Sequence, residues 1–145
     1  MAITPVNNWK NILDKLKNKL RSEFGNTLPV YVGHSTKNVG SQYLRLDPVS
    51  SDLIEYAVRS EKREFTINML YYSSVKDIEK ISLDNVLRIV SRIEALIHDN
   101  INITLEDSSV AYNCRIESTE LNALEEEEEY VVQFVWKCIH RGNLA

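Results

Sequence analysis

The stretch REFTINMLYY, residues 63–72, decides the fold expected from this sequence. Apolar and polar side chains alternate along it, and the apolar set is Phe65, Ile67, Met69 and Tyr71. Because successive side chains of a strand point to opposite faces of a sheet, the pattern predicts a strand with one continuously apolar face. The other face becomes apolar only at Leu70 and Tyr72, so we expect that end of the strand to be covered on both faces.

Shorter β-rich runs lie on either side of this strand. The expected strands are 28–32, 42–46, 52–59, 101–105, 110–118 and 130–140. Asp47 and Pro48 are expected to end the strand 42–46, and residues 60–62 to join 52–59 to 63–72. Trp136 lies in the middle of the longest run, where we expect it to be buried in the core.

Two segments carry the apolar spacing of amphipathic helices. The first covers residues 5–23 and follows Thr4, which can cap free backbone N–H groups, and Pro5, which suits the first helical position. The second runs from Ser82 to about residue 98, and its apolar arc is wider than one sheet contact needs. The extra width predicts a second neighbour, either the first helix or another subunit. Together these elements predict an α+β fold, a largely antiparallel β-sheet with two α-helices packed on one face, plus a β-hairpin extension.

Length and composition limit the classes of protein that this chain can represent. Its 145 residues, 43% of them hydrophobic, suit one domain that spans residues 1–145. A net charge of −4 disfavours a general binder of duplex nucleic acid, which usually carries a basic footprint. No apolar run approaches the ~20 residues that span a bilayer, and the first residues lack a secretory pattern. We therefore expect a protein of the cytoplasm with no membrane partner.

A few residues could carry chemistry, although no catalytic motif is present. Cys138 and His140 share one face of a predicted strand, and Cys114 could join them as a third metal ligand. Three ligands without a paired C-x-x-C make a weak signal, so buried thiols are favoured, with a Cys114–Cys138 disulfide as a further alternative. The carboxylates that could form a two-metal nuclease site are Asp99, Glu106, Asp107 and Glu117. Solvated loops are the favoured interpretation, and no cofactor is expected.

Five consecutive glutamates are the one compositional oddity. They are Glu125, Glu126, Glu127, Glu128 and Glu129. Repulsion between glutamates on the same face of a strand costs only ~0.6 kcal/mol per pair in water, so the solvated start of a strand tolerates the run. Such a run can also act as a gatekeeper that prevents aggregation through the edge of the sheet. Alternatively, these residues can line the hole of an oligomer as a ring of negative charge that repels DNA phosphates.

The chain carries, in order, the segments NILDKLKNKL followed by VYV, then YLRLDPVSSDLIEY, REFTINMLYY, NVLRIVSRIEALIHDN, and finally RIEST with EEEEEYVVQFVWKC. Together these segments cover almost the whole chain. Their order resembles that of the tail terminator, or tail-completion, proteins of long-tailed bacteriophages.

The resemblance implies a structural virion protein without enzymatic activity or cofactor. It implies a ring, usually hexameric, at the head-proximal end of the tail tube, which stops tube growth and joins the tail to the head. The implied partners are copies of the chain itself, the tail tube protein, a neck or connector protein, and genomic DNA that passes without specific binding. In that setting Glu125–Glu129 would line the channel, and subunit contacts would include Tyr71, Tyr72, Ile89 and Leu96.

Two other functions are also compatible with the sequence. A head-tail connector or stopper in the neck would share the virion location but contact the portal side. A metal-dependent nuclease would need the acidic loops to converge in space.

Overall fold

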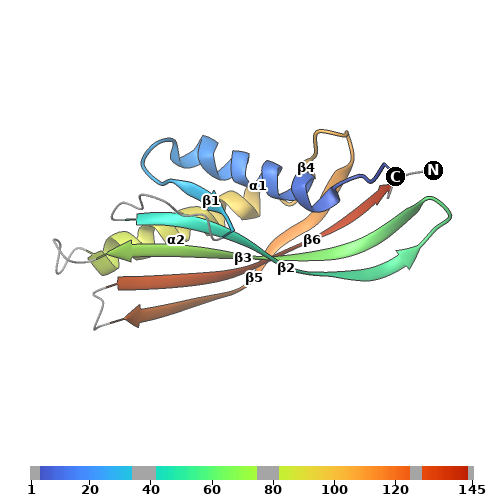
Figure 1. Ribbon diagram of the computed structural model, residues 1–145. Helices are drawn as coiled ribbons and strands as arrows, with labels where there is room; N and C mark the ends of the chain where they lie inside the picture. Colours follow the sequence, from blue (N-terminus) through green and yellow to red (C-terminus); the bar gives the residue numbers. More distant parts are fainter. Residues whose placement is uncertain (1–3, 34–41, 75–81, 125–128, 144–145) are drawn as a thin grey trace.

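The computed structural model describes residues 4–33, 42–74, 82–124 and 129–143. Its elements are, in order, α1 (Asn8–Phe24), β1 (Val30–Val32), β2 (Gln42–Tyr56), β3 (Ser60–Ser74), α2 (Ser82–Asp99), β4 (Ile103–Thr104), β5 (Val110–Leu124) and β6 (Glu129–Asn143). The strands form one sheet in the order β1-β2-β3-β6-β5-β4. β1 runs parallel to β2, and the other neighbours are antiparallel. Both helices lie on one side of the long twisted sheet (Figure 1), which confirms the predicted α+β class.

The sheet has one buried face and one face without a helix. Along β6 every second residue from Val132 to Gly142 is buried, the alternation that a strand covered on one side requires. Trp136 pairs with Ile67 of β3 and Ile116 of β5 and is only 1% exposed, so its predicted core position is confirmed. We call the opposite face the helix-free face. By register it carries Tyr43, Arg45 and Asp47 of β2, Glu64 and Tyr72 of β3, Arg115 of β5, and Glu129 and Lys137 of β6.

The two helices complete the core by packing on the buried face of the sheet. The buried residues of α1 are Ile12, Leu13, Leu16, Leu20 and Phe24, and those of α2 are Val86, Val90, Ile93 and Ile97. Each set recurs at spacings of three or four residues, so it forms one stripe along its helix. Both stripes join the same hydrophobic cluster as the inner residues of the strands.

β2 differs most from the sequence-based expectation. Asp47 and Pro48 do not end it, because Pro48 pairs with Ile67 and the strand continues to Tyr56. A register shift follows between Pro48 and Ser50, and from this point no strand of the described residues pairs with the outer side of β2. A proline can occupy such a position because no neighbouring strand needs its missing N–H.

Several other boundaries also move. α1 begins at Asn8, since the side chain of Asn7 accepts a hydrogen bond from the backbone N–H of Lys10 at 3.0 Å and so provides the cap expected of Thr4. The turn between β2 and β3 is closed by the Ala57 N–H, which donates to the Ser60 carbonyl. β5 continues to Leu124 beside the first half of β6, past its predicted end at residue 118, and β6 continues past residue 140 to Asn143 beside the start of β3.

Candidate assembly surfaces

The paired tyrosines at the end of β3 lie on opposite faces of the sheet. Tyr71 is 1% exposed and donates a hydrogen bond from its hydroxyl to Oε1 of Gln42 at 2.7 Å. It therefore belongs to the core of its own protomer, which corrects its expected place in a subunit contact. Tyr72 is half-buried on the helix-free face, and so is Leu70. The predicted second layer over that end is not formed by any described residue.

An aromatic cluster covers that end of the helix-free face instead. The rings of Tyr43 and Tyr72 stack with their centroids 4.6 Å apart and 13° between their planes. Tyr31 meets Tyr43 edge-on at 6.1 Å, and the guanidinium of Arg45 lies 5.6 Å from the centre of the Tyr72 ring. Burial, and then the neighbouring Tyr72, raise the pKa of the Tyr43 hydroxyl above its usual value. The Tyr43 hydroxyl therefore stays protonated at physiological pH.

A chain of ion pairs crosses the middle of the same face. One guanidinium nitrogen of Arg115 lies 3.1 Å from Glu64 and 2.8 Å from Glu117, and the ammonium of Lys137 lies 3.7 Å from Glu64. Burial alone would lower the pKa of Arg115, but the hydrogen bonds to the two carboxylates outweigh it and raise that pKa. Arg115 thus joins β5 to β3 across β6, and its positive charge is already matched by carboxylates.

Other cations of this face are occupied in similar ways. Arg45 pairs with Asp47 at 3.0 Å, and Arg141 pairs with Glu55 at 2.9 Å. The ammonium of Lys62 lies 5.8 Å from the centre of the Tyr112 ring. These cations are poorly placed to hold a phosphate backbone, because a phosphate would have to compete with partners already in place.

Most of the glutamate run lies outside the described residues. Glu125, Glu126, Glu127 and Glu128 belong to the undescribed segment. Glu129 begins β6, where it pairs with Ser74 and Leu124 on the helix-free face. The prediction that the run lines a channel is therefore untested, although its last member is on the same face as the ion pairs.

The wide apolar arc of α2 contacts α1 on one side. Ile89 and Leu96 are half-buried and pack against the core. Beside them Arg92 donates to the Glu23 carboxylate at 2.8 Å and lies over the ring of Phe24. On the other side of the arc Leu83 and Leu87 are 41% and 47% exposed. The first helix thus explains part of the extra width, and the remainder is open surface.

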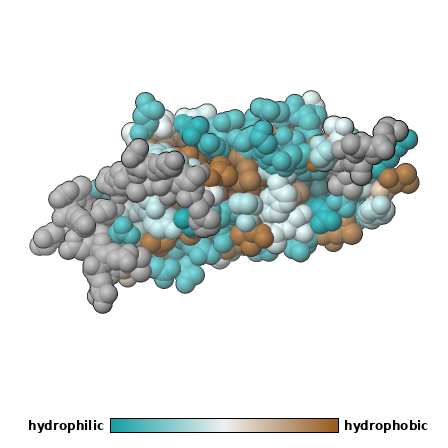
Figure 2. Space-filling view, in the orientation of Figure 1, coloured by the Kyte–Doolittle hydropathy of each residue, from teal (hydrophilic) through white to brown (hydrophobic). Residues whose placement is uncertain are grey.

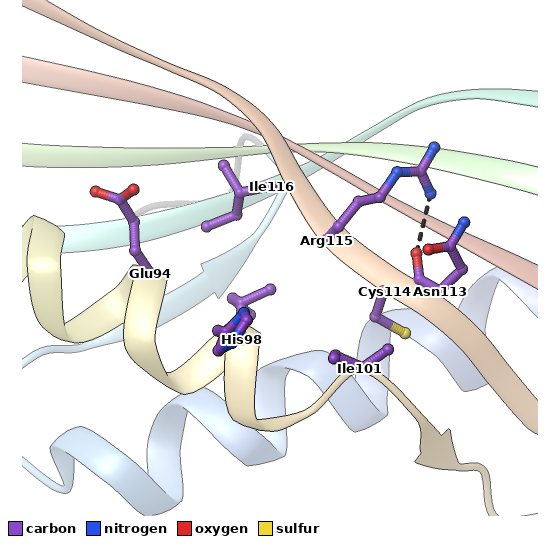
Figure 3. Close-up of a pocket in the computed structure, with 8 residues that line it drawn as sticks. Glu94, His98, Ile101, Asn113, Cys114, Arg115 and Ile116 are labelled. Atoms are coloured by element: carbon purple, nitrogen blue, oxygen red, sulfur yellow. Dashed lines mark hydrogen bonds between the residues drawn. The ribbon is translucent and has the colours of Figure 1, made fainter.

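A groove separates α2 from β5 (Figure 3). It has a volume of about 380 Å³ and is lined by Glu94, Ile97, His98, Ile101, Asn113, Cys114, Arg115 and Ile116. Cys114 and Ile116 lie on the side of β5 that faces α2, whereas Arg115 leaves from the other side. Ile101 is 47% exposed at one end of the groove. Its floor is apolar, and the carboxylate of Glu94 stands on its helical wall.

Exposed apolar side chains follow β2 from Val49 to the turn at Val58, and this turn lies beyond the ends of the helices (Figure 1). These side chains are Val49, Leu53, Ile54, Tyr56 and Val58, with exposed fractions from 48% to 95%. Apolar surface is visible in Figure 2 at the end of the molecule where the hairpin of β2 and β3 lies. Clustered exposed apolar side chains mark interaction surfaces more often than single ones do. We call these five residues the hairpin patch.

The outer edges of the sheet differ from each other. β4 pairs only with Val110 and Ala111, so within the described residues the rest of β5 has no strand on its outer side. The outer edge of β2 beyond Leu46 is likewise open in the described part, but Pro48 and two register shifts interrupt it. A bulged, proline-bearing edge resists uncontrolled strand pairing, whereas a long regular edge invites it.

The residues considered for chemistry do not converge. In residues 4–33, 42–74, 82–124 and 129–143, no three His, Cys, Asp or Glu side chains are arranged to hold a metal ion. Asp107 accepts hydrogen bonds from Ser109, and Glu117 is paired with Arg115, so the nuclease hypothesis loses its carboxylate cluster. Cys114 and Cys138 are free, buried thiols, and His140 binds Ser109. A hydrogen bond with Cys114, reinforced by burial, raises the pKa of Cys138 and keeps it protonated.

Neither α1 nor α2 is long and apolar enough to cross a bilayer.

Fold and surfaces together define an α+β protein whose notable features are a charge-matched sheet face and apolar surface on separate elements. No protein-family model matches the sequence, and no curated protein does either. Among solved structures, the fold is similar to that of a chain in the virion of a native gene transfer agent particle. That likeness has a TM-score of 0.67 at 9% identity and covers 94% of this chain and 98% of the other. A second solved structure is 14% identical with a TM-score of 0.55 and covers 91% and 92%. At these identities the likenesses show a shared fold.

Proposed function

We propose that this chain is a structural virion protein that forms a hexameric ring at the head-proximal end of a phage tail tube. There it ends tube polymerisation and presents the surface to which the head is joined. The observation that carries this proposal is the likeness to a virion chain over nearly the full length of both chains. The order of sequence segments that resembles tail terminators supports the finer assignment.

Ring formation is supported by the distribution of open surface. The hairpin patch and the α2–β5 groove lie on different elements of one protomer. Contacts between two different patches are heterologous, and they close into a ring when the rotation between neighbours permits it. We propose that Tyr72, Ile89 and Leu96 contribute to contacts between subunits or with the tube, and that Tyr71 supports Tyr72 from inside the core.

Passage of DNA is supported by the charges of the helix-free face. Arg45, Arg115, Lys137 and Arg141 are each paired with a carboxylate, and Glu129 lies on the same face. We propose that this face lines the channel and that Glu125–Glu129 add a band of negative charge there. Such a wall repels phosphates and lets DNA slide without binding.

Removal of the chain from the producing genome tests the proposal. Without a terminator, tail tubes should grow to irregular and excessive lengths and remain unattached to filled heads. Tails of normal length that lack heads would contradict the terminator assignment and favour a connector on the portal side. Intact infectious particles would contradict any essential role in the virion.

A further inference from the structure

We propose that the groove between α2 and β5 receives the hairpin patch of a second copy of this chain. The inference rests on the proposed self-assembly and names the contact through which neighbouring subunits would hold one another. It requires that the two surfaces match in apolar character, in charge and in length.

The apolar character of the two surfaces matches. The patch offers Val58, which is 95% exposed at the turn, and Tyr56, which is 71% exposed. The groove offers exposed Ile101 and half-buried Ile116, with buried Ile97 beneath them, in a space of about 380 Å³. A side chain the size of valine or tyrosine fits such a volume, and burying it against isoleucine removes apolar surface of both copies from water.

The charges are complementary. Arg59 follows Val58 in the turn, is exposed, and forms no ion pair with any described residue. Glu94 lines the groove and Asp99 ends α2, and both are exposed and without an ion pair in the described part of the chain. Docking of the patch would bring the lone cation of the turn beside these two carboxylates.

The lengths and directions of the strands are also compatible. β2 and β5 stand at opposite sides of the antiparallel array β2-β3-β6-β5, so a neighbouring β2 laid beside β5 with the same sheet orientation runs antiparallel to it. The open part of β2 from Pro48 to Tyr56 spans about 30 Å, and the open part of β5 is longer. The turn of the neighbour would then stop near β4, which closes the end of that edge.

Side chains, and not a continuous hydrogen-bond ladder, would hold this contact. Pro48 has no N–H to donate, and the register shifts after Pro48 and Leu53 put backbone groups of β2 out of step. The predicted interface is therefore reversible and sensitive to the side chains at the tip of the hairpin.

Cysteine cross-linking in particles tests the contact. The pair Val58→Cys and Ile101→Cys places thiols at the turn and at the end of the groove, both at exposed positions. Mild oxidation should yield covalent oligomers up to a closed ring, with the linked peptides identified by mass spectrometry. The matched control pairs Val58→Cys with Leu83→Cys. Leu83 is about as exposed as Ile101, but it lies near the start of α2, about 24 Å along the helix from Asp99, the last residue before the end of the groove. Particles that carry Val58→Cys alone or Ile101→Cys alone show how much of the cross-linking involves the native thiol of Cys114.

Charge reversal gives a second readout. Arg59→Glu should lower the cross-linked fraction about tenfold, because it sets like charges against each other. Adding Glu94→Arg and Asp99→Arg should restore it. The control Glu106→Arg changes an exposed carboxylate outside the groove and should have no effect.

The outcomes separate this inference from the proposed function. If particles contain the chain but the Val58–Ile101 pair links no better than the Val58–Leu83 pair, the contact is wrong while the virion role stands. If the chain is absent from particles, the virion role fails, and the same gel is run on concentrated purified protein. A covalent dimer through Val58 and Ile101 would still support the contact, and its absence would overturn it.

Discussion

The hydroxyl oxygen of Ser109 lies 2.8 Å from Nε2 of His140, although the two residues are 31 positions apart in the chain. The same hydroxyl donates to the Asp107 carboxylate, so it accepts its second hydrogen bond from the Nε2–H of a neutral imidazole. His140 is 1% exposed, and a Cβ added at Gly142 would collide with its ring. These contacts fasten the turn before β5 to the end of β6.

We expect this contact to make stability depend on pH. Burial lowers the pKa of His140 below its ordinary value of 6.5, and Asp107 opposes that shift only in part. Below pH 6.5 the unfolded chain binds a proton that the folded chain resists, so the free energy of unfolding should fall as pH drops toward the folded pKa. Urea unfolding between pH 5 and 8 measures this slope, which should be absent above pH 7 and reduced in His140→Gln.

The Asp107 carboxylate affects the free energy of unfolding at a lower pH than His140 does. The hydrogen bond from Ser109 lowers the pKa of this carboxylate, so its contribution is present above its usual value near 3.8 and is lost as pH falls through the folded value. Ser109→Ala should cost about 1 to 3 kcal/mol at neutral pH by leaving His140 without its acceptor. Equal stability of the two proteins would show that the contact is not formed in solution.

Truncation of the central tryptophan should strongly destabilise the fold. Trp136 is 1% exposed, so Trp136→Ala should cost ~3 to 5 kcal/mol in chemical denaturation. Its indole N–H is buried without a partner among the described residues, and Trp136→Phe should cost clearly less because it removes that group. A loss under 1 kcal/mol for the alanine variant would contradict the core position.

The ion pairs of the helix-free face should be coupled but individually weak. A double-mutant cycle with Arg115→Met and Glu64→Gln measures the pair, whose nitrogen and oxygen are 3.1 Å apart. Because both side chains remain partly exposed, we expect a coupling of about 0.5 to 1 kcal/mol that shrinks in high salt. Additive effects of the two substitutions would mean that the pair contributes no energy.

Neutralising the glutamate run should spare the fold and impair DNA passage. Replacing Glu125–Glu129 by Gln leaves side-chain size nearly unchanged while it removes five negative charges. We expect normal thermal unfolding of the purified chain and slower genome ejection from particles that carry the variant. Unchanged ejection and infectivity would return the run to a solvated start of β6.

Strong periodicity made much of the fold predictable. The alternation around Phe65 and the spacing in α2 gave the right elements, because each must bury one face against a common core. The continuation of β2 through Pro48 was not predictable locally, since a proline breaks a strand except at an edge, and the edge position follows from tertiary pairing.

The surfaces were less predictable than the fold. The alternation placed Tyr71 with the apolar set and Tyr72 on the other face, but it could not show what covers that end of the strand, so both were expected in subunit contacts. The groove beside Cys114 depends on how α2 packs against β5, which no local pattern encodes. The exposed apolar residues of the hairpin patch look like ordinary strand residues until their turn is seen to lie beyond the ends of the helices. The available signal was the apolar run before the 57–60 turn, with Leu53, Ile54 and Tyr56, which continues into the turn at Val58.

An image reconstruction of the neck of intact particles is the decisive test of the proposed terminator role. We expect a ring of this 16.8 kDa chain on the last ring of the tail tube, with the helix-free face toward the lumen. A ring against the portal, or particles without the chain, would contradict that role.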